Sequence, residues 1–114
     1  MDKLNLYQNA IKEILLDIYN LGKSTRNREG IDAQYVFDTE NNHYILIDVG
    51  WKNREYMYAS FVHIDIKDGK IWVQRNNTEF DLAELLVEKG VAKQDIVLGL
   101  HSPFMRQFSD YGVA

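Results

Sequence analysis

The chain has 114 residues, of which 46% are hydrophobic and 26% are charged, and its formal net charge is −4. This length predicts one domain, spanning residues 1–114, and the acidic balance argues against autonomous DNA binding, which usually requires a basic patch. The absence of cysteine excludes disulfides and thiolate metal sites. No apolar run approaches the roughly 20 residues that cross a membrane, and no signal-peptide core is present, so we expect a cytoplasmic protein.

Residues 3–21 are predicted to form an amphipathic helix. Its apolar side chains recur at helical spacing: Tyr7, Ile11, Ile14, Leu15 and Ile18. Gly22 is expected to end the helix, because glycine tolerates the left-handed conformation that follows many helices. The polar stretch 23–32 is predicted to be a loop, and it holds the one small basic cluster, residues 23–28.

Four strands are predicted next, at residues 34–38, 43–51, 56–66 and 70–75. Asp68-Gly69 separates the last two and favours a two-residue type I′ hairpin, since both residues adopt positive φ readily. The other connections are turns at 39–42 and 52–55. The pattern therefore predicts an antiparallel meander in the order 1-2-3-4.

The hairpin turns predict a register, and the register predicts two faces. Ile66 pairs with Ile71 and Ile64 with Val73 around the Asp-Gly turn; working backward, Ile45 pairs with Val62. One face then carries the apolar set expected to form the core beneath the N-terminal helix: Val36, Ile45, Ile47, Val49, Val62, Ile64, Ile66, Ile71 and Val73.

The second face of this sheet is expected to need a cover because it holds many aromatic side chains. The C-terminal segment, a second subunit or a partner protein could cover it, and we expect a homo-oligomer. The candidate partner-binding residues on this face are Tyr44, Phe61, His63, Asp65, Trp72 and Gln74.

The C-terminal third predicts a helix and a docked tail. Residues 78–81 resemble a capping box, and Gly90 ends the leucine-rich helix that follows. Residues 93–100 are compatible with a helical turn or an extended segment. The tail stays apolar to its end, which favours docking. The predicted fold class is α+β: a four-stranded antiparallel meander with the N-terminal helix on one face, and the C-terminal helix and tail closing the other.

The polar side chains of the second face offer one candidate site for chemistry. His63 and Asp65 point to the same side of one strand and could form a metal or acid–base site with His101. A polar row on a contact surface explains the pair more simply. A nuclease-type carboxylate site could use Asp38, Asp48, Asp65 and Asp68, but Asp68 is explained by its turn and Asp38 by its turn entry. We therefore predict no catalytic, cofactor-binding or metal-binding residues.

Four segments together resemble the XisI-like proteins, which are fdxN element excision controlling factors of cyanobacteria. They are MDKLNLYQNAIKEIL, HYILIDVGW, VHIDIKDGKIWVQRNNTE and LVEKGVAKQDIVLGLHSPFMRQFSDYGVA. Ala92 and Ser102 depart from the prolines expected there. The resemblance implies a role in programmed DNA excision during heterocyst differentiation, beside a site-specific recombinase and the nuclease-like protein XisH, and it carries no catalytic residues.

The resemblance predicts a non-enzymatic accessory factor that acts through a XisH-like partner. One alternative is an antitoxin-like protein that neutralises a nuclease-like partner. Another is a metal-dependent enzyme built on His63, Asp65 and His101.

Overall fold

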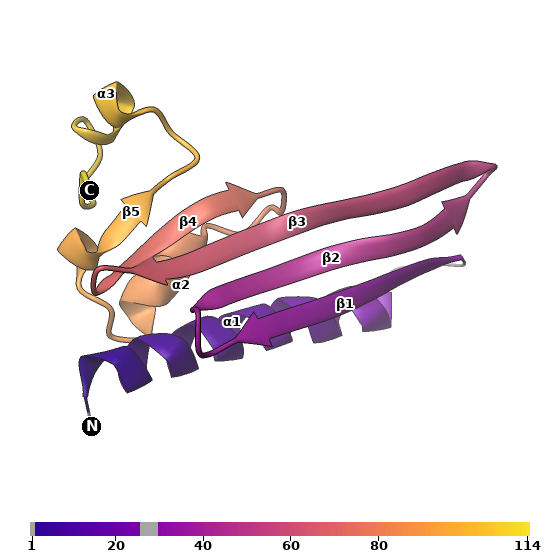
Figure 1. The fold of residues 1–114 in the computed structure, drawn as a ribbon, viewed down its shortest axis with the longest axis horizontal. Coiled ribbons are helices and arrows are strands. Elements are labelled where there is room, and N and C mark those ends of the chain that lie inside the picture. The colour runs from indigo at the N-terminus through magenta and orange to yellow at the C-terminus, as the bar shows by residue number, and fades with distance from the viewer. Residues whose placement is uncertain (1, 26–29) are drawn as a thin grey trace.

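The fold is one five-stranded sheet with its two longest helices on one side (Figure 1). The computed structural model describes residues 2–25 and 30–114. The elements in chain order are α1 (Lys3–Thr25), β1 (Ile31–Asp38), β2 (His43–Lys52), β3 (Glu55–Lys67), β4 (Lys70–Asn76), α2 (Leu82–Glu88), the 3-10 turn η1 (Lys93–Asp95), β5 (Ile96–Leu98) and α3 (Pro103–Arg106). The strand order is β1-β2-β3-β4-β5.

The α+β class and the four-strand meander are confirmed, but the sheet is not purely antiparallel. β5 adds a fifth strand, which runs parallel to β4. Parallel neighbours need a crossover connection, and α2 provides it. The buried side chains of α2 belong to the same core cluster as those of α1. The expectation that α2 closes the opposite face is therefore wrong.

Helix α1 forms as its apolar periodicity predicts, and its buried stripe covers the sheet. The predicted stop at Gly22 is wrong, because the helix continues to Thr25. The side chains of the basic cluster at 23–28 lie outside the described residues, and the prediction about them stays a prediction. Among the described residues, no helix is both long and apolar enough to cross a membrane.

Two β-bulges interrupt the register that the turns predict. The pairs Ile66–Ile71 and Ile64–Val73 form as expected, and Asp68 has the positive φ of a type I′ turn. Phe61 has no partner on β2, and Gln74 has none on β3. Such an extra residue shifts all later pairs by one.

The first bulge exchanges the two faces of β2 relative to the prediction. Ile45 pairs with His63 rather than with Val62, and Leu46 takes the place opposite Val62. Tyr44 and Leu46 are therefore fully buried against α1, whereas Ile45 is only half-buried. We call the side covered by α1 and α2 the helix face and the other side the open face.

The far end of the β2–β3 hairpin, residues 49–58, extends beyond α1 as an arm, and β1 lies beside it as far as Gly50 (Figure 1). Its turn is tight, with positive φ at Asn53 and Arg54. Because no helix covers it, its large side chains are exposed: Trp51 by 61%, Tyr56 by 55%, Met57 by 41% and Tyr58 by 67%.

The C-terminal tail docks, as the sequence predicts, but on the edge of the sheet. The backbone N–H of Gly112 donates to Ile96 O at 2.8 Å, and Val97 forms a parallel bridge with Gly112. Lys70 Nζ donates a hydrogen bond to the carbonyl oxygen of Ala114. The tail thus covers the β4–β5 end of the open face and leaves the arm bare.

Candidate functional site

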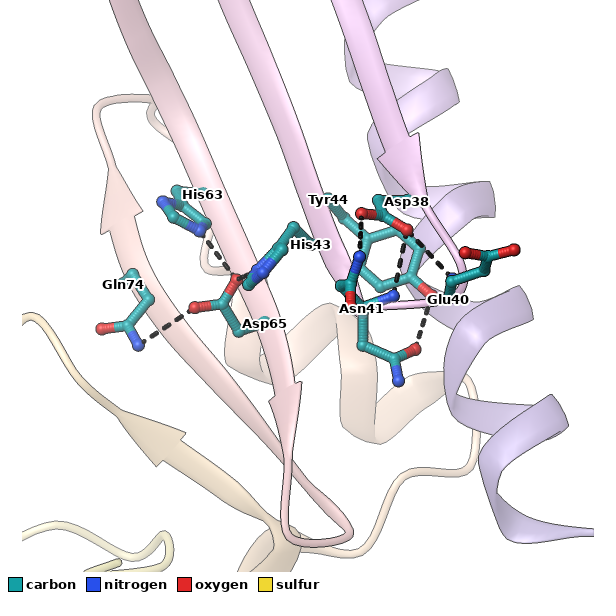
Figure 2. A network of polar contacts seen from close by, with 9 residues as sticks. Asp38, Glu40, Asn41, His43, Tyr44, His63, Asp65 and Gln74 are labelled. Carbon is teal, nitrogen blue, oxygen red and sulfur yellow. Dashed lines mark hydrogen bonds and ion pairs between the residues drawn. The ribbon is translucent and has the colours of Figure 1, made fainter.

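Three polar side chains converge on the open face of the sheet. His43 is the first residue of β2 and pairs directly with Asp65 on β3, and His63 precedes Asp65 by two residues. Side chains two apart on a strand share a face, so the sheet directs all three to one point. Figure 2 shows both imidazole rings turned toward the Asp65 carboxylate. We call these three residues the polar cluster.

One carboxylate oxygen serves both imidazoles. His43 Nδ1 and His63 Nε2 each lie 2.7 Å from Asp65 Oδ1. The two rings meet nearly edge to face, at an interplanar angle of 79°. The side chain of Asp65 is only 16% exposed, compared with 51% for His43 and 33% for His63. The cluster therefore has an anchored carboxylate beneath two more accessible imidazoles.

The contacts within the cluster favour its charged forms. The hydrogen bond to Asp65 raises the pKa of His43 above its usual value. Burial acts to raise the pKa of Asp65, but the hydrogen bonds from His43 and His63 together hold it below its usual value.

Gln74 and Trp72 join the cluster from β4, as the sequence predicts. Gln74 is the bulged residue, and its Nε2 donates toward Asp65 Oδ2 at 3.4 Å. Trp72 pairs with Asp65, with Lys67 Nζ 4.2 Å and the Arg106 guanidinium 5.1 Å from its ring centroid. Trp72 is thus already contacted by the tail.

Two of the predicted partner-binding residues do not lie on the open face, where the sequence analysis placed them. Tyr44 is fully buried on the helix face, where its hydroxyl donates to Asn42 Oδ1 at 3.0 Å. Phe61 packs against the core and lines an open groove with Ile18 and Tyr19 of α1. The first bulge is the physical reason for both corrections, because it changes which residues face α1.

His43 is the cluster member that the sequence analysis misses. The predicted register places His43 opposite Ile64 and therefore toward the core. The bulge at Phe61 moves it opposite Asp65. Among the described residues, His43 rather than His101 groups with His63 and Asp65, and their donor atoms lie within 4.8 Å of one another. A histidine at the first position of a strand carries no signal in the sequence that it will pair with Asp65.

Asp38 and Asp68 both lie at turns, as the sequence predicts. Asp38 Oδ1 accepts hydrogen bonds from the backbone of Glu40 and Asn41, both at 3.0 Å (Figure 2). These bonds, led by that from Asn41, lower the pKa of Asp38. Asp68 occupies a positive-φ turn position.

The comparisons with known proteins decide the family. The model of the XisI protein family matches residues 1–113. The chain belongs to the XisI family. No curated protein matches it.

Two crystal structures from Anabaena variabilis share the fold of this XisI family member. A XisI-like protein is 44% identical, with a TM-score of 0.87, and the match covers 97% of this chain and 99% of that one. The fdxN element excision controlling factor XisI is 26% identical, with a TM-score of 0.88, and the match covers 99% of this chain and all of that one. The fold is thus shared over nearly the whole length of the chain.

Proposed function

We propose that this chain is a non-enzymatic accessory factor that controls excision of a DNA element by binding a XisH-like protein. Membership of the XisI family supports the excision role, as does the likeness to a structure described as an excision controlling factor. The net charge of −4 favours DNA contact through other components, such as the partner or a site-specific recombinase.

The exposed arm is the observation that most favours binding of a partner protein. Trp51 and Tyr58 are 61% and 67% exposed, on a hairpin that no helix covers. Exposed aromatic clusters mark protein interaction sites, and Trp and Tyr are the residues most enriched at binding hot spots. The hydrogen-bonded strands beneath these side chains already order the backbone, which lowers the entropic cost of binding. We assign the arm to the XisH-like partner.

Calorimetry with the purified cognate XisH-like protein tests this assignment. Truncating both arm aromatics in a Trp51→Ser/Tyr58→Ser variant should weaken binding by about 30-fold or more, since a hot spot contributes about 2 kcal/mol. Phe104→Ser is the matched control, because Phe104 is 66% exposed on the tail. No binding of the wild-type chain at micromolar concentration would refute the partner. Equal weakening by the control would refute the arm.

Excision itself needs a separate readout. A reporter carrying a DNA element should lose it in cells that hold the recombinase, the XisH-like protein and this chain, and the arm variant should lower that frequency. Expression of the XisH-like protein alone distinguishes a neutralising, antitoxin-like role. Toxicity that this chain relieves, with no effect on excision, would replace the proposed function by that alternative.

Light scattering addresses the expected homo-oligomer. We propose that the arm meets the partner rather than a second copy. A wild-type dimer that the arm variant dissociates into monomers would contradict that choice.

A further inference from the structure

We propose that His43, His63 and Asp65 bind a divalent transition-metal ion of the Zn²⁺ class on the open face of the sheet. The three donor atoms are His43 Nδ1, His63 Nε2 and Asp65 Oδ1, and all lie within 4.8 Å of one another. Zinc bonds to imidazole nitrogen and carboxylate oxygen measure about 2.0–2.2 Å. One ion can therefore reach all three donors after small side-chain rotations.

The sheet presents these donors without help from any flexible segment. His43 and Asp65 are directly paired across β2 and β3, and His63 lies two residues before Asp65 on the same face. The two imidazole rings converge on a single carboxylate oxygen, each at 2.7 Å (Figure 2). A site built on paired strands holds its ligands more precisely than one built on loops.

The surroundings orient the carboxylate for this role. Gln74 Nε2 lies 3.4 Å from Asp65 Oδ2, the oxygen that the histidines do not contact. Metal-binding side chains are commonly held by such outer hydrogen bonds, which fix their orientation. Arg75, which pairs with His63 across β3 and β4, directs its Nε to the carbonyl oxygen of Ser60 at 2.6 Å. Arg75 is thus engaged elsewhere, and Asp65 Oδ1 accepts from the two histidines.

The donor set selects the class of ion. Two imidazoles and one carboxylate suit Zn²⁺, Co²⁺, Ni²⁺ and Fe²⁺, whereas Mg²⁺ and Ca²⁺ prefer oxygen ligands alone. Three protein ligands leave at least one coordination position open. The side chains of His43 and His63 are 51% and 33% exposed, so water or a side chain of another protein can reach the site and complete it.

Hydrogen bonding alone also accounts for the two 2.7 Å contacts, and in that case the cluster only ties β2 to β3. The two alternatives differ in one property. A purely hydrogen-bonded cluster needs no ion, and its histidines keep an acceptor oxygen in the Asp65→Asn variant. A metal site loses an anionic ligand in that variant, so its affinity for the ion falls.

Titration of the chelator-treated full chain with ZnCl₂ by calorimetry, and with CoCl₂ by visible absorption, tests the proposal. The wild type should bind one ion, give the absorption bands of protein-bound Co²⁺ and unfold at a higher temperature with Zn²⁺. His43→Ala, His63→Ala and Asp65→Asn should each weaken binding by more than about 100-fold, and Gln74→Ala by about 10-fold, as expected for loss of an outer contact.

His101→Ala is the matched control, because His101 is the third histidine of the chain and lies outside the cluster. It should bind Zn²⁺ as the wild type does. Circular dichroism of each metal-free variant establishes that the fold persists, and Asp65→Asn offers the mildest change in shape. Absence of heat and of Co²⁺ bands in the wild type up to millimolar metal would overturn the proposal. The proposal would also be overturned if folded Asp65→Asn bound Zn²⁺ as tightly as the wild type, or if His101→Ala no longer bound Zn²⁺.

Discussion

The reversal of the β2 faces leads to a direct comparison between two neighbouring residues. Leu46 is fully buried on the helix face, while Ile47 is half-buried on the open face. A strict turn-derived register would place Ile47 in the core and Leu46 outside it. Replacing each residue by alanine therefore discriminates between the two arrangements.

The magnitudes follow from burial. Leu46→Ala removes about three methylene equivalents from a site with no exposure, which costs roughly 2.4 kcal/mol in transfer free energy. The cavity left behind raises the total to about 3 kcal/mol or more. Ile47→Ala removes as many carbons from a surface that is already partly in water, and should cost about 1 kcal/mol. For a domain of this size, 3 kcal/mol corresponds to a fall in Tm of about 10–15 °C.

Urea unfolding followed by circular dichroism measures both free energies. Circular dichroism is preferable to tryptophan fluorescence because Trp51 is already 61% exposed in the folded state. The slope of free energy against urea should be the same for both variants and the wild type, which would show that only stability has changed. A larger loss for Ile47→Ala than for Leu46→Ala would refute the bulged register and the face assignment that depends on it.

Three further predictions concern the ends of the chain. Hydrogen bonds from Lys3 and then Tyr7 lower the pKa of Asp95. The wild type should therefore be more stable than Asp95→Asn at neutral pH, and this difference should shrink as the pH falls below roughly 4. A difference that persists in acid would contradict this. Burial, followed by the hydrogen bond to Asp95, raises the pKa of Tyr7 to about 12. Stability in unfolding experiments should therefore fall as the pH rises from roughly 10 toward 12, and Tyr7→Phe should reduce that fall. An equal fall in both proteins would rule out Tyr7 as its source. Gly112→Ala should undock the tail, because a Cβ there would lie 2.5 Å from a backbone oxygen, whereas Gly22→Ala in α1, with open space around it, should stabilise the protein by about 0.5–1 kcal/mol. Limited proteolysis and thermal unfolding measure the two effects. Equal protease resistance of the tail in the two variants would argue against tight docking.

The elements with strong local signals follow the sequence closely. The Asp68-Gly69 turn and the apolar stripe of α1 lie where the sequence predicts them. Each depends on residues near one another in the chain, so their chemistry can be judged without knowing the rest of the fold. The end of α1 departs from the prediction, because a glycine inside a helix costs about 1 kcal/mol, an amount that packing can outweigh. The predicted capping box at 78–81 is also wrong, since Asp81 itself is the N-cap of α2 and accepts a hydrogen bond from the backbone N–H of Glu84.

The candidate site shows the opposite behaviour. His63, Asp65 and Trp72 could be placed on one surface from the hairpin alone, because the adjacent turn sets the pair Asp65–Trp72 and His63 lies two residues before Asp65. The predicted pair His63–Gln74 is wrong, because the second bulge places Arg75 opposite His63, yet Gln74 still reaches Asp65. His43 could not, because its position depends on an extra residue, Phe61, in the neighbouring strand. The three-residue strand β5 gave an ambiguous pattern because it is too short for alternation to be recognised.

The sequence by itself thus determined the amphipathic helix, the four strands and their turns, and the resemblance to the XisI family. The tertiary structure decided which side of β2 is buried, which strand lies beside β4 and which histidine meets Asp65. The physical reason is that alternation in a strand has a period of two, so one bulged residue reverses every side chain beyond it. Whether a strand bulges depends on packing against α1 and on both neighbouring strands, which come together only when the chain folds.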